Sequence, residues 1–150
     1  MARRPVPGDI VRIDYAEDRH TYGQVLTTPY VGIYDLQATG DMNIGEIIAA
    51  PVLFVVAVYD RVVSRGWSSV GKAPDGAPRI AIPEYFMQDM FQPASCQIID
   101  AQGNARPATP QECAGLERAA VWDAVHVEER LRDHYAGRPN AYLESLKLRT

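Results

Sequence analysis

The chain has few of the residues that build metal sites and disulfide frameworks. Its 150 residues include two cysteines and three histidines. The cysteines, Cys96 and Cys113, do not form a CxxC pair, so we expect reduced thiols in a cytoplasmic protein. His126 and His134 stand eight positions apart on one expected helix, which separates them by about 12 Å, too far for one ion. The sequence therefore predicts no metal and no cofactor.

Long apolar runs and clusters of basic residues are also missing. The longest apolar run, residues 51–59, is far too short to cross a bilayer. The two arginines near the start of the chain are not followed by the apolar stretch of a secretory signal. The formal net charge is −4, and no Lys/Arg cluster supports binding of nucleic acid through a basic face. We therefore expect neither nucleic acid nor a membrane as a partner.

The motifs of common catalytic sites are absent as well. The sequence contains no GxGxxG, GxxxxGK[ST] or GxSxG pattern, and neither cysteine has a histidine close to it in sequence. Triads assemble from distant segments, so a reactive thiol remains an alternative, and Cys113 lies in the first turns of an expected helix. A small buried thiol is the favoured interpretation. His20, beside Glu17 and Asp18, is interpreted as part of an acidic surface turn rather than of a metal site.

The first two thirds of the chain read mainly as strands. Eleven glycines and eleven prolines favour short strands and turns over a helical bundle. Residues 51–60 are rich in β-branched side chains and predict a buried strand at the centre of the sheet. Asn43 and Glu46 have the spacing of a helix cap, which predicts a short helix ended by Pro51. Further strands are expected at residues 10–15, 22–26, 31–36, 67–70, 79–82 and 96–100, and residues 83–90 remain ambiguous.

The last third predicts helices. Thr109, Pro110 and Glu112 form a capping sequence for a short helix, and Asn140 is expected to cap another. Between them, residues 123–136 predict a helix closed by Gly137. Its inward stripe is expected to be Val127, Leu131 and Tyr135, with Glu128 and Arg132 paired on the outer face.

These elements together predict one α+β domain spanning residues 1–150, with 1–107 mainly β and 108–150 mainly helical. The expected architecture is a small, strongly bent antiparallel sheet or an SH3-like barrel, with the C-terminal helices packed on it.

Seven sequence blocks, in order over nearly the whole chain, carry a family resemblance. They are PGDIVRI (7–13), YGQVL (22–26), VGIYDL (31–36), PVLFVVAVYD (51–60), GWSSVGKAP (66–74), PEYFMQD (83–89) and GLERAAVWDAVHVEERLRDHYAG (115–137). Together they resemble the immunity protein 26 family of bacterial polymorphic toxin systems. The last block is the most specific of them, whereas PGDIV opens many small barrels, including MazF-like toxins.

The resemblance implies inhibition by binding. Such immunity proteins protect a cell by occupying the catalytic domain of a cognate toxin, and they need no catalytic residue of their own. The same family label includes a small atypical phosphotriesterase, so the alternative function is a small hydrolase of organophosphates or phosphoesters. Classical phosphotriesterases use a histidine-rich two-metal site, which three scattered histidines do not build. A MazF-like ribonuclease is a third interpretation, and it requires a basic groove.

Five carboxylates near expected loops are the candidate binding residues. They are Glu17 and Asp18 in the acidic turn, together with Asp35, Asp41 and Glu46. Negative charge at these positions would steer a basic toxin and would mainly raise the association rate. A solvated polar surface is the alternative interpretation of the same residues.

Overall fold

The protein is described here by a computed structural model, which covers residues 5–59 and 66–150. Asp60, the last residue of the expected central strand, and the two N-terminal arginines lie outside the described residues. The chain forms two compact units. Unit 1 comprises Met1–Ala81 and Val121–Arg138, and unit 2 comprises Ile82–Ala120 and Pro139–Thr150. The single-domain organisation stays a prediction.

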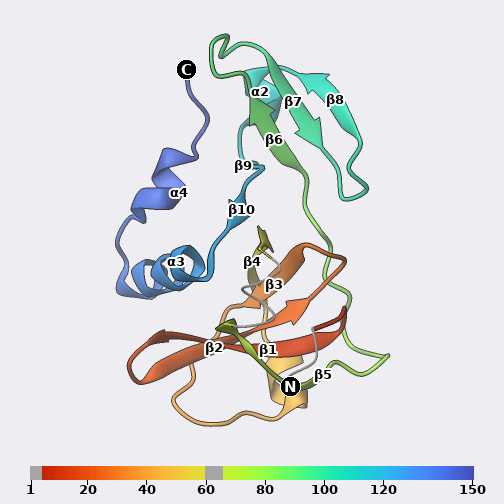
Figure 1. The fold of residues 1–150 in the computed structure, drawn as a ribbon, viewed down its shortest axis with the longest axis vertical. Coiled ribbons are helices and arrows are strands. Elements are labelled where there is room, and N and C mark those ends of the chain that lie inside the picture. The colour runs from red at the N-terminus through yellow and green to blue at the C-terminus, as the bar shows by residue number, and fades with distance from the viewer. Residues whose placement is uncertain (1–4, 60–65) are drawn as a thin grey trace. The chain divides into compact units, whose positions relative to one another are not determined.

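Unit 1 is built on a sheet with the strand order β10-β4-β3-β2-β1-β5 (Figure 1). Its strands pair antiparallel, except that β10 runs parallel to β4. Buried side chains line up across the register, as where Ile33 of β3 lies opposite Phe54 of β4. The strands are β1 (Asp9–Ala16), β2 (Arg19–Val25), β3 (Tyr30–Tyr34), β4 (Val52–Val58), β5 (Ser68–Lys72) and β10 (Val121–Trp122).

Strand β4 is buried as expected, but its place in the sheet differs from the prediction. Phe54, Val55 and Val56 are consecutive and all buried, so both faces of the strand are covered. β4 nevertheless lies second from the edge, because the two-residue strand β10 pairs with its far side. A two-residue strand has no periodicity that sequence can reveal.

Two helices complete unit 1. Helix α1 (Ile44–Ile48) begins at Asn43, whose side chain accepts a hydrogen bond from the Glu46 amide, as predicted. Its Ile47 is fully buried in a cluster with Ile10, Tyr22 and Tyr34. Helix α3 (Ala124–Ala136) ends at Gly137, where φ is +71°, a conformation that glycine adopts without strain.

The inward face of α3 is confirmed, and its outer face is not as predicted. Val127 and Leu131 are fully buried, and Tyr135, the third residue of the predicted stripe, is half-buried. Glu128 and Arg132 do not form an exposed pair: Trp67 Nε1 donates to Glu128 Oε2 at 3.2 Å, and Arg132 Nε donates to the Tyr15 carbonyl at 2.8 Å. Both polar side chains therefore form hydrogen bonds that hold α3 against other segments of unit 1, one at Trp67 and one at Tyr15.

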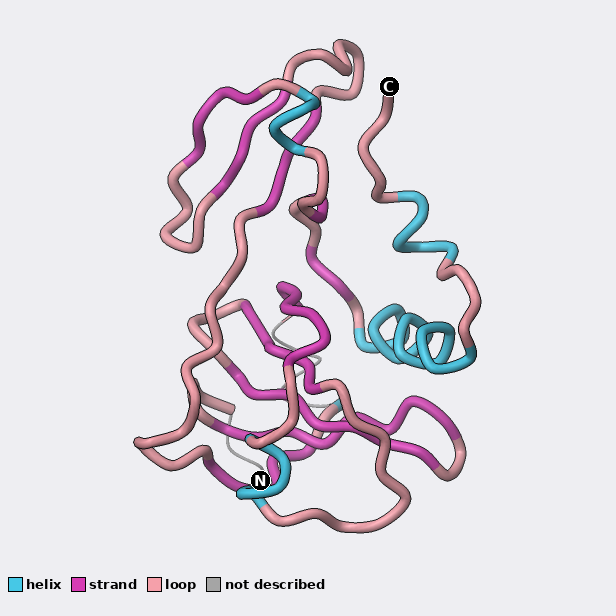
Figure 2. Tube along the Cα trace, turned by 180° about the vertical axis from the view of Figure 1, so that it is seen from behind, coloured by secondary structure: helices cyan, strands magenta, loops and turns pink. Residues whose placement is uncertain are grey.

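Unit 2 contains a second sheet, in the order β8-β7-β6-β9 (Figure 2). Its core consists of Phe86, Cys96, Ile98 and Cys113. Helix α2 (Pro110–Cys113) has the predicted capping box between Thr109 and Glu112, and α4 (Ala141–Ser145) begins at Asn140 as predicted. The strands are β6 (Tyr85–Gln88), β7 (Cys96–Ile99), β8 (Ala105–Ala108) and β9 (Glu117–Arg118).

The α+β class is confirmed, with three corrections to its details. The described strands form two open, mixed sheets, neither of them strongly curled, rather than one strongly bent antiparallel sheet or a closed SH3-like barrel. Residues 79–82 are not a strand: they belong to the segment that connects β5 with β6, where Ile80 packs against the buried cluster around Ile47. β7 is not the last strand, because β8, β9 and β10 follow it, so the last third is less helical than expected.

Candidate functional site

The predicted acidic turn lies between β1 and β2. Ala16 pairs with Arg19, which leaves Glu17 and Asp18 as the two residues of a tight turn. Both side chains are exposed. A carboxylate in such a turn is held in place by the strands behind it while its oxygens stay available to a partner.

Two stacked tyrosines connect this turn with Asp35. The rings of Tyr15 and Tyr135 lie 5.6 Å apart, and Tyr135 Oη donates to Asp35 Oδ1 at 2.9 Å and to the Leu36 carbonyl at 3.3 Å. Burial raises the pKa of Tyr135 well above its usual range, and the bond to Asp35 adds to this. The pKa of Tyr15 is also raised, mainly by burial. Arg19 opposes this increase, and Asp18 adds to it.

The tyrosine pair therefore connects β1, the strand that leads into the acidic turn, with Asp35. Within the described residues, no hydrogen bond or ion pair joins Glu17 or Asp18 directly to Asp35. Sequence reasoning did not assign Tyr15 and Tyr135 to this site. They stand 120 positions apart, and only the packing of α3 against β1 joins them.

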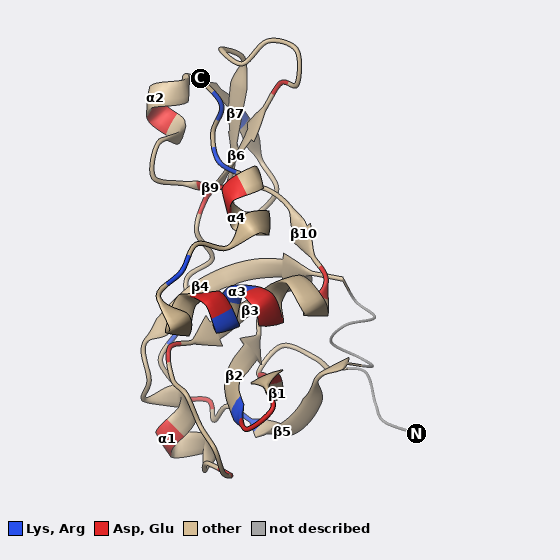
Figure 3. Ribbon diagram, turned by 90° about the vertical axis from the view of Figure 1, so that its left-hand side faces the viewer, with Lys and Arg blue, Asp and Glu red and all other residues tan. Residues whose placement is uncertain are grey.

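Asp41 and Glu46 occupy different surroundings from the other three carboxylates. The Asp41 side chain is 99% exposed and lies 3.6 Å from Nη1 of Arg12, whose Nε also contacts Asp14 at 3.0 Å. Glu46 is exposed in the first turn of α1, one of the acidic positions coloured red in Figure 3. Among the described residues, no hydrogen bond or ion pair joins Glu46 to the other four carboxylates. The five residues do not form one patch through direct contacts.

His20 was predicted to lie in a surface turn, but it is buried in the structure. Its side chain is 1% exposed, and Nε2 lies 3.0 Å from Tyr22 Oη. Burial lowers the pKa of His20, with a smaller contribution from Arg12, while Asp14, a hydrogen bond to the Gly40 backbone and Asp41 act in the opposite direction. His20 begins a run of four consecutive buried residues in β2, and Tyr22, two positions along the same face, is buried with it.

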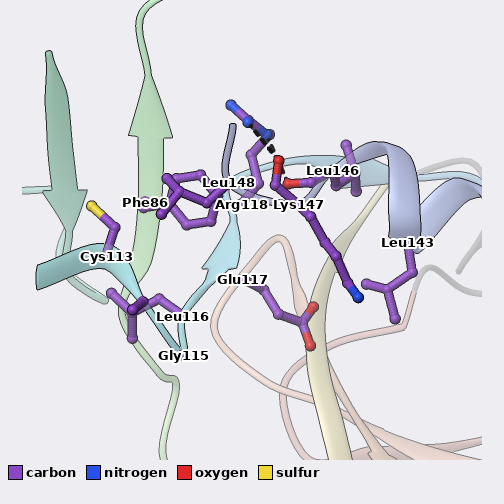
Figure 4. Close-up of a pocket in the computed structure, with 11 residues that line it drawn as sticks. Phe86, Cys113, Gly115, Leu116, Glu117, Arg118, Leu143, Leu146, Lys147 and Leu148 are labelled. Carbon is purple, nitrogen blue, oxygen red and sulfur yellow. Dashed lines mark hydrogen bonds between the residues drawn. The ribbon is translucent and has the colours of Figure 1, made fainter. Parts of the chain in front are cut away.

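Unit 2 contains a largely apolar pocket of about 460 Å³ (Figure 4). Phe86 and several leucines form its walls, and the C-terminal segment after α4 closes one side. Arg118 Nε donates to the Leu146 carbonyl at 2.9 Å, its Nη2 donates to the Lys147 carbonyl and to Gln88 Oε1, both at 3.2 Å, and the guanidinium lies 4.8 Å from the centre of the Phe86 ring. Arg118 therefore fixes the chain around the pocket.

The two thiols behave as buried apolar groups, as favoured from the sequence. Cys113 is fully buried and Cys96 is 4% exposed. Burial raises the pKa of the Cys113 thiol, and the neighbouring Cys96 adds to this increase. A raised pKa disfavours the thiolate, which is the nucleophilic form. The helix that carries Cys113 has four residues, too few for a strong dipole.

Within the part of the chain that the structure describes, no group of three or more His, Cys, Asp or Glu side chains is placed to hold a metal ion. No helix in the described ranges is long and apolar enough to cross a membrane.

Comparison with known proteins identifies one family. Residues 6–97, about three fifths of the chain, match the family model described as Immunity protein 26. No curated protein matches the chain, and no solved structure matches it. The matched range contains six of the seven blocks on which the sequence resemblance was based. The block at residues 115–137, interpreted as the most specific one, lies outside the matched range.

Proposed function

The chain belongs to the immunity protein 26 family, and on that premise we propose that it neutralises a cognate bacterial toxin by binding to it. The partner is a toxin domain, and the complex forms in the cytoplasm. Inhibition requires only that the chain occupy the toxin and needs no turnover by the chain itself. The match over residues 6–97 is the observation that carries this proposal.

The acidic region of unit 1 supports a basic partner. Glu17 and Asp18 are exposed on a tight turn, and Asp35 is held nearby by Tyr135. Because the stacked tyrosines and the strand pairing fix the backbone beneath these carboxylates, a partner would meet them already in place. Complementary charge of this kind accelerates encounter more than it strengthens the final complex.

An affinity pull-down from the native cell tests the proposal first. The tagged chain should retain one stoichiometric partner, identified by mass spectrometry, that carries a toxin domain. Expression of that domain alone should arrest growth of a host cell, and co-expression of the chain should restore it. A chain that fails to protect against the recovered toxin, but hydrolyses a phosphotriester, would support the alternative function instead.

A further inference from the structure

The connection between β6 and β7 exposes two large apolar side chains. Phe91 is 87% exposed and Met90 is 72% exposed. They are the two most exposed large hydrophobic residues in the described part of the chain. We call residues 89–95 the hairpin tip. Exposed aromatic and methionine side chains next to each other are unfavourable in water, and they are typical of contact surfaces.

The backbone of the hairpin tip is fixed by its own hydrogen bonds. Asp89 Oδ1 accepts hydrogen bonds from the amides of Phe91 and Gln92, both at 2.8 Å. The Asp89 amide donates to the Ser95 carbonyl and the Ser95 amide donates to the Gln92 carbonyl, both at 2.9 Å. These bonds hold Met90 and Phe91 in the turn without using either side chain.

The C-terminal segment braces the hairpin tip from one side, and Figures 1 and 2 show it running beside the β6–β7 connection. Gln88 Nε2 donates to the Pro93 carbonyl at 2.8 Å and to the Arg149 carbonyl at 2.7 Å. Gln88 Oε1 accepts from the Arg149 amide at 2.9 Å, and Arg149 Nη2 donates to the Asp89 carbonyl at 3.1 Å. Two segments 61 residues apart thus lock the same turn.

Rigidity and exposure together distinguish this turn from an ordinary surface loop. A flexible loop that presents an aromatic residue loses conformational freedom when it binds, and this loss weakens the complex. A turn fixed in advance avoids most of that loss. Interface hot spots are most often large side chains that enter a pocket on the partner, surrounded by contacts that exclude water.

We propose that Met90 and Phe91 form the apolar anchor by which the chain holds its toxin, with the Phe91 ring inserted in a concave apolar pocket of the toxin domain. This inference rests on the proposed function, and it names the contact that the function requires. Neither Met90 nor Phe91 carries a charge, so the contribution of these two side chains to binding is insensitive to salt.

The structure favours a protein pocket over the two other possible occupants. Peripheral membrane binding through so small an apolar group needs support from a basic cluster, and the sequence contains no Lys/Arg cluster. A second copy of the chain carries the same net charge of −4, and this repulsion opposes self-association through a contact of only two side chains.

The test uses the toxin domain recovered by the pull-down, with full-length variants of the chain. Phe91→Ala and Met90→Ala should each weaken binding by about tenfold or more, mainly through faster dissociation. The loss should be the same at about 50 mM and about 500 mM salt. Phe91→Leu should retain most of the affinity. Val125→Ala is the matched control, because Val125 is an exposed apolar residue of unit 1, and it should change the affinity less than about twofold.

Each other outcome has a definite meaning. Wild-type affinity in Phe91→Ala, with its thermal unfolding midpoint unchanged, refutes the anchor and leaves the proposed function intact. A wild-type chain that binds no toxin domain overturns the proposed function and the anchor with it. Wild-type binding to vesicles of phosphatidylglycerol and phosphatidylcholine, lost in Phe91→Ala, shows a membrane anchor instead. A wild-type dimer that Phe91→Ala converts to a monomer shows that the tip is a self-association contact.

Discussion

Protonation of His20 opposes the folding of unit 1. The ordinary pKa of this side chain is 6.5, and burial lowers the pKa in the folded chain, with Arg12 contributing in the same direction. Between the two values, the unfolded chain binds more protons than the folded chain. The free energy of unfolding therefore falls as the pH decreases below about 6.5 and is fully recovered above that pH.

A substitution at this position isolates the effect. His20→Gln keeps a polar side chain but cannot titrate, so we expect its stability to vary less than that of the wild type between about pH 7.5 and pH 5.5. Urea unfolding at a series of pH values measures both slopes. Equal slopes for the two proteins would contradict the account of His20.

The two cysteines permit a second test at the residue scale. Cys113 is fully buried, and burial raises its pKa, so the folded chain should react slowly with a disulfide reagent such as DTNB. After unfolding in guanidinium, both thiols of the chain should react at the rate of a free cysteine. Rapid labelling of one thiol in the folded chain would identify an activated cysteine and revive the nucleophile hypothesis.

Among the individual residues, the side chains that make local bonds were the predictable ones. Asn43, Thr109 and Asn140 cap helices through side chains that bond to amides three residues away, so the sequence contains the whole interaction. The Tyr15–Tyr135 pair depends on residues far apart in the chain, and no local pattern indicates it. The same holds for the bond between Trp67 and Glu128.

At the scale of an element, helix α2 depends on its capping box. Thr109 Oγ1 accepts from the Glu112 amide at 3.2 Å, and Glu112 Oε1 accepts from the Thr109 amide at 3.0 Å. Thr109→Ala removes the first bond and should lower the free energy of unfolding by about 1 kcal/mol. Chemical denaturation measures this change, and Thr109→Ser, which keeps the hydroxyl, should stay close to wild type. A Thr109→Ala variant as stable as the wild type would show that α2 is held by the burial of Cys113 instead.

Elements with a strong periodicity or a cap were predictable, and elements created by pairing were not. α3 was recognised from its apolar spacing and from Gly137, and β4 from its β-branched residues. β9 and β10 contain two residues each, and they exist as strands only because β6 and β4 lie beside them. The second sheet was missed for the same reason, since sequence patterns indicate strands but not which strands share a sheet.

At the scale of the whole molecule, the charge of the chain bears on how fast it meets its partner. The formal net charge is −4, and reversing Glu17 and Asp18 to lysine adds two charges each and brings it to 0. We expect this double variant to associate with a basic toxin several-fold more slowly at low salt, and as fast as the wild type at high salt. Stopped-flow or biosensor kinetics measure both rates.

A control separates the turn from the net charge. Asp75 is exposed elsewhere in unit 1, and Asp75→Lys adds the same charge as a single reversal in the turn. It should slow association less than Asp18→Lys does. Equal effects would show that only the total charge matters and that the acidic turn is not a contact.

The central claim is that the chain neutralises a toxin by binding it, and titration of the toxin's activity tests this most directly. Purified chain is added in increasing amounts to a fixed concentration of the toxin domain, well above the dissociation constant. The account predicts that activity falls linearly to zero at one equivalent, and that toxin released by denaturation and refolded regains its activity. Loss of activity at a small fraction of one equivalent, with toxin that stays inactive after release, would contradict the account, because it would mean that the chain destroys its partner by catalysis.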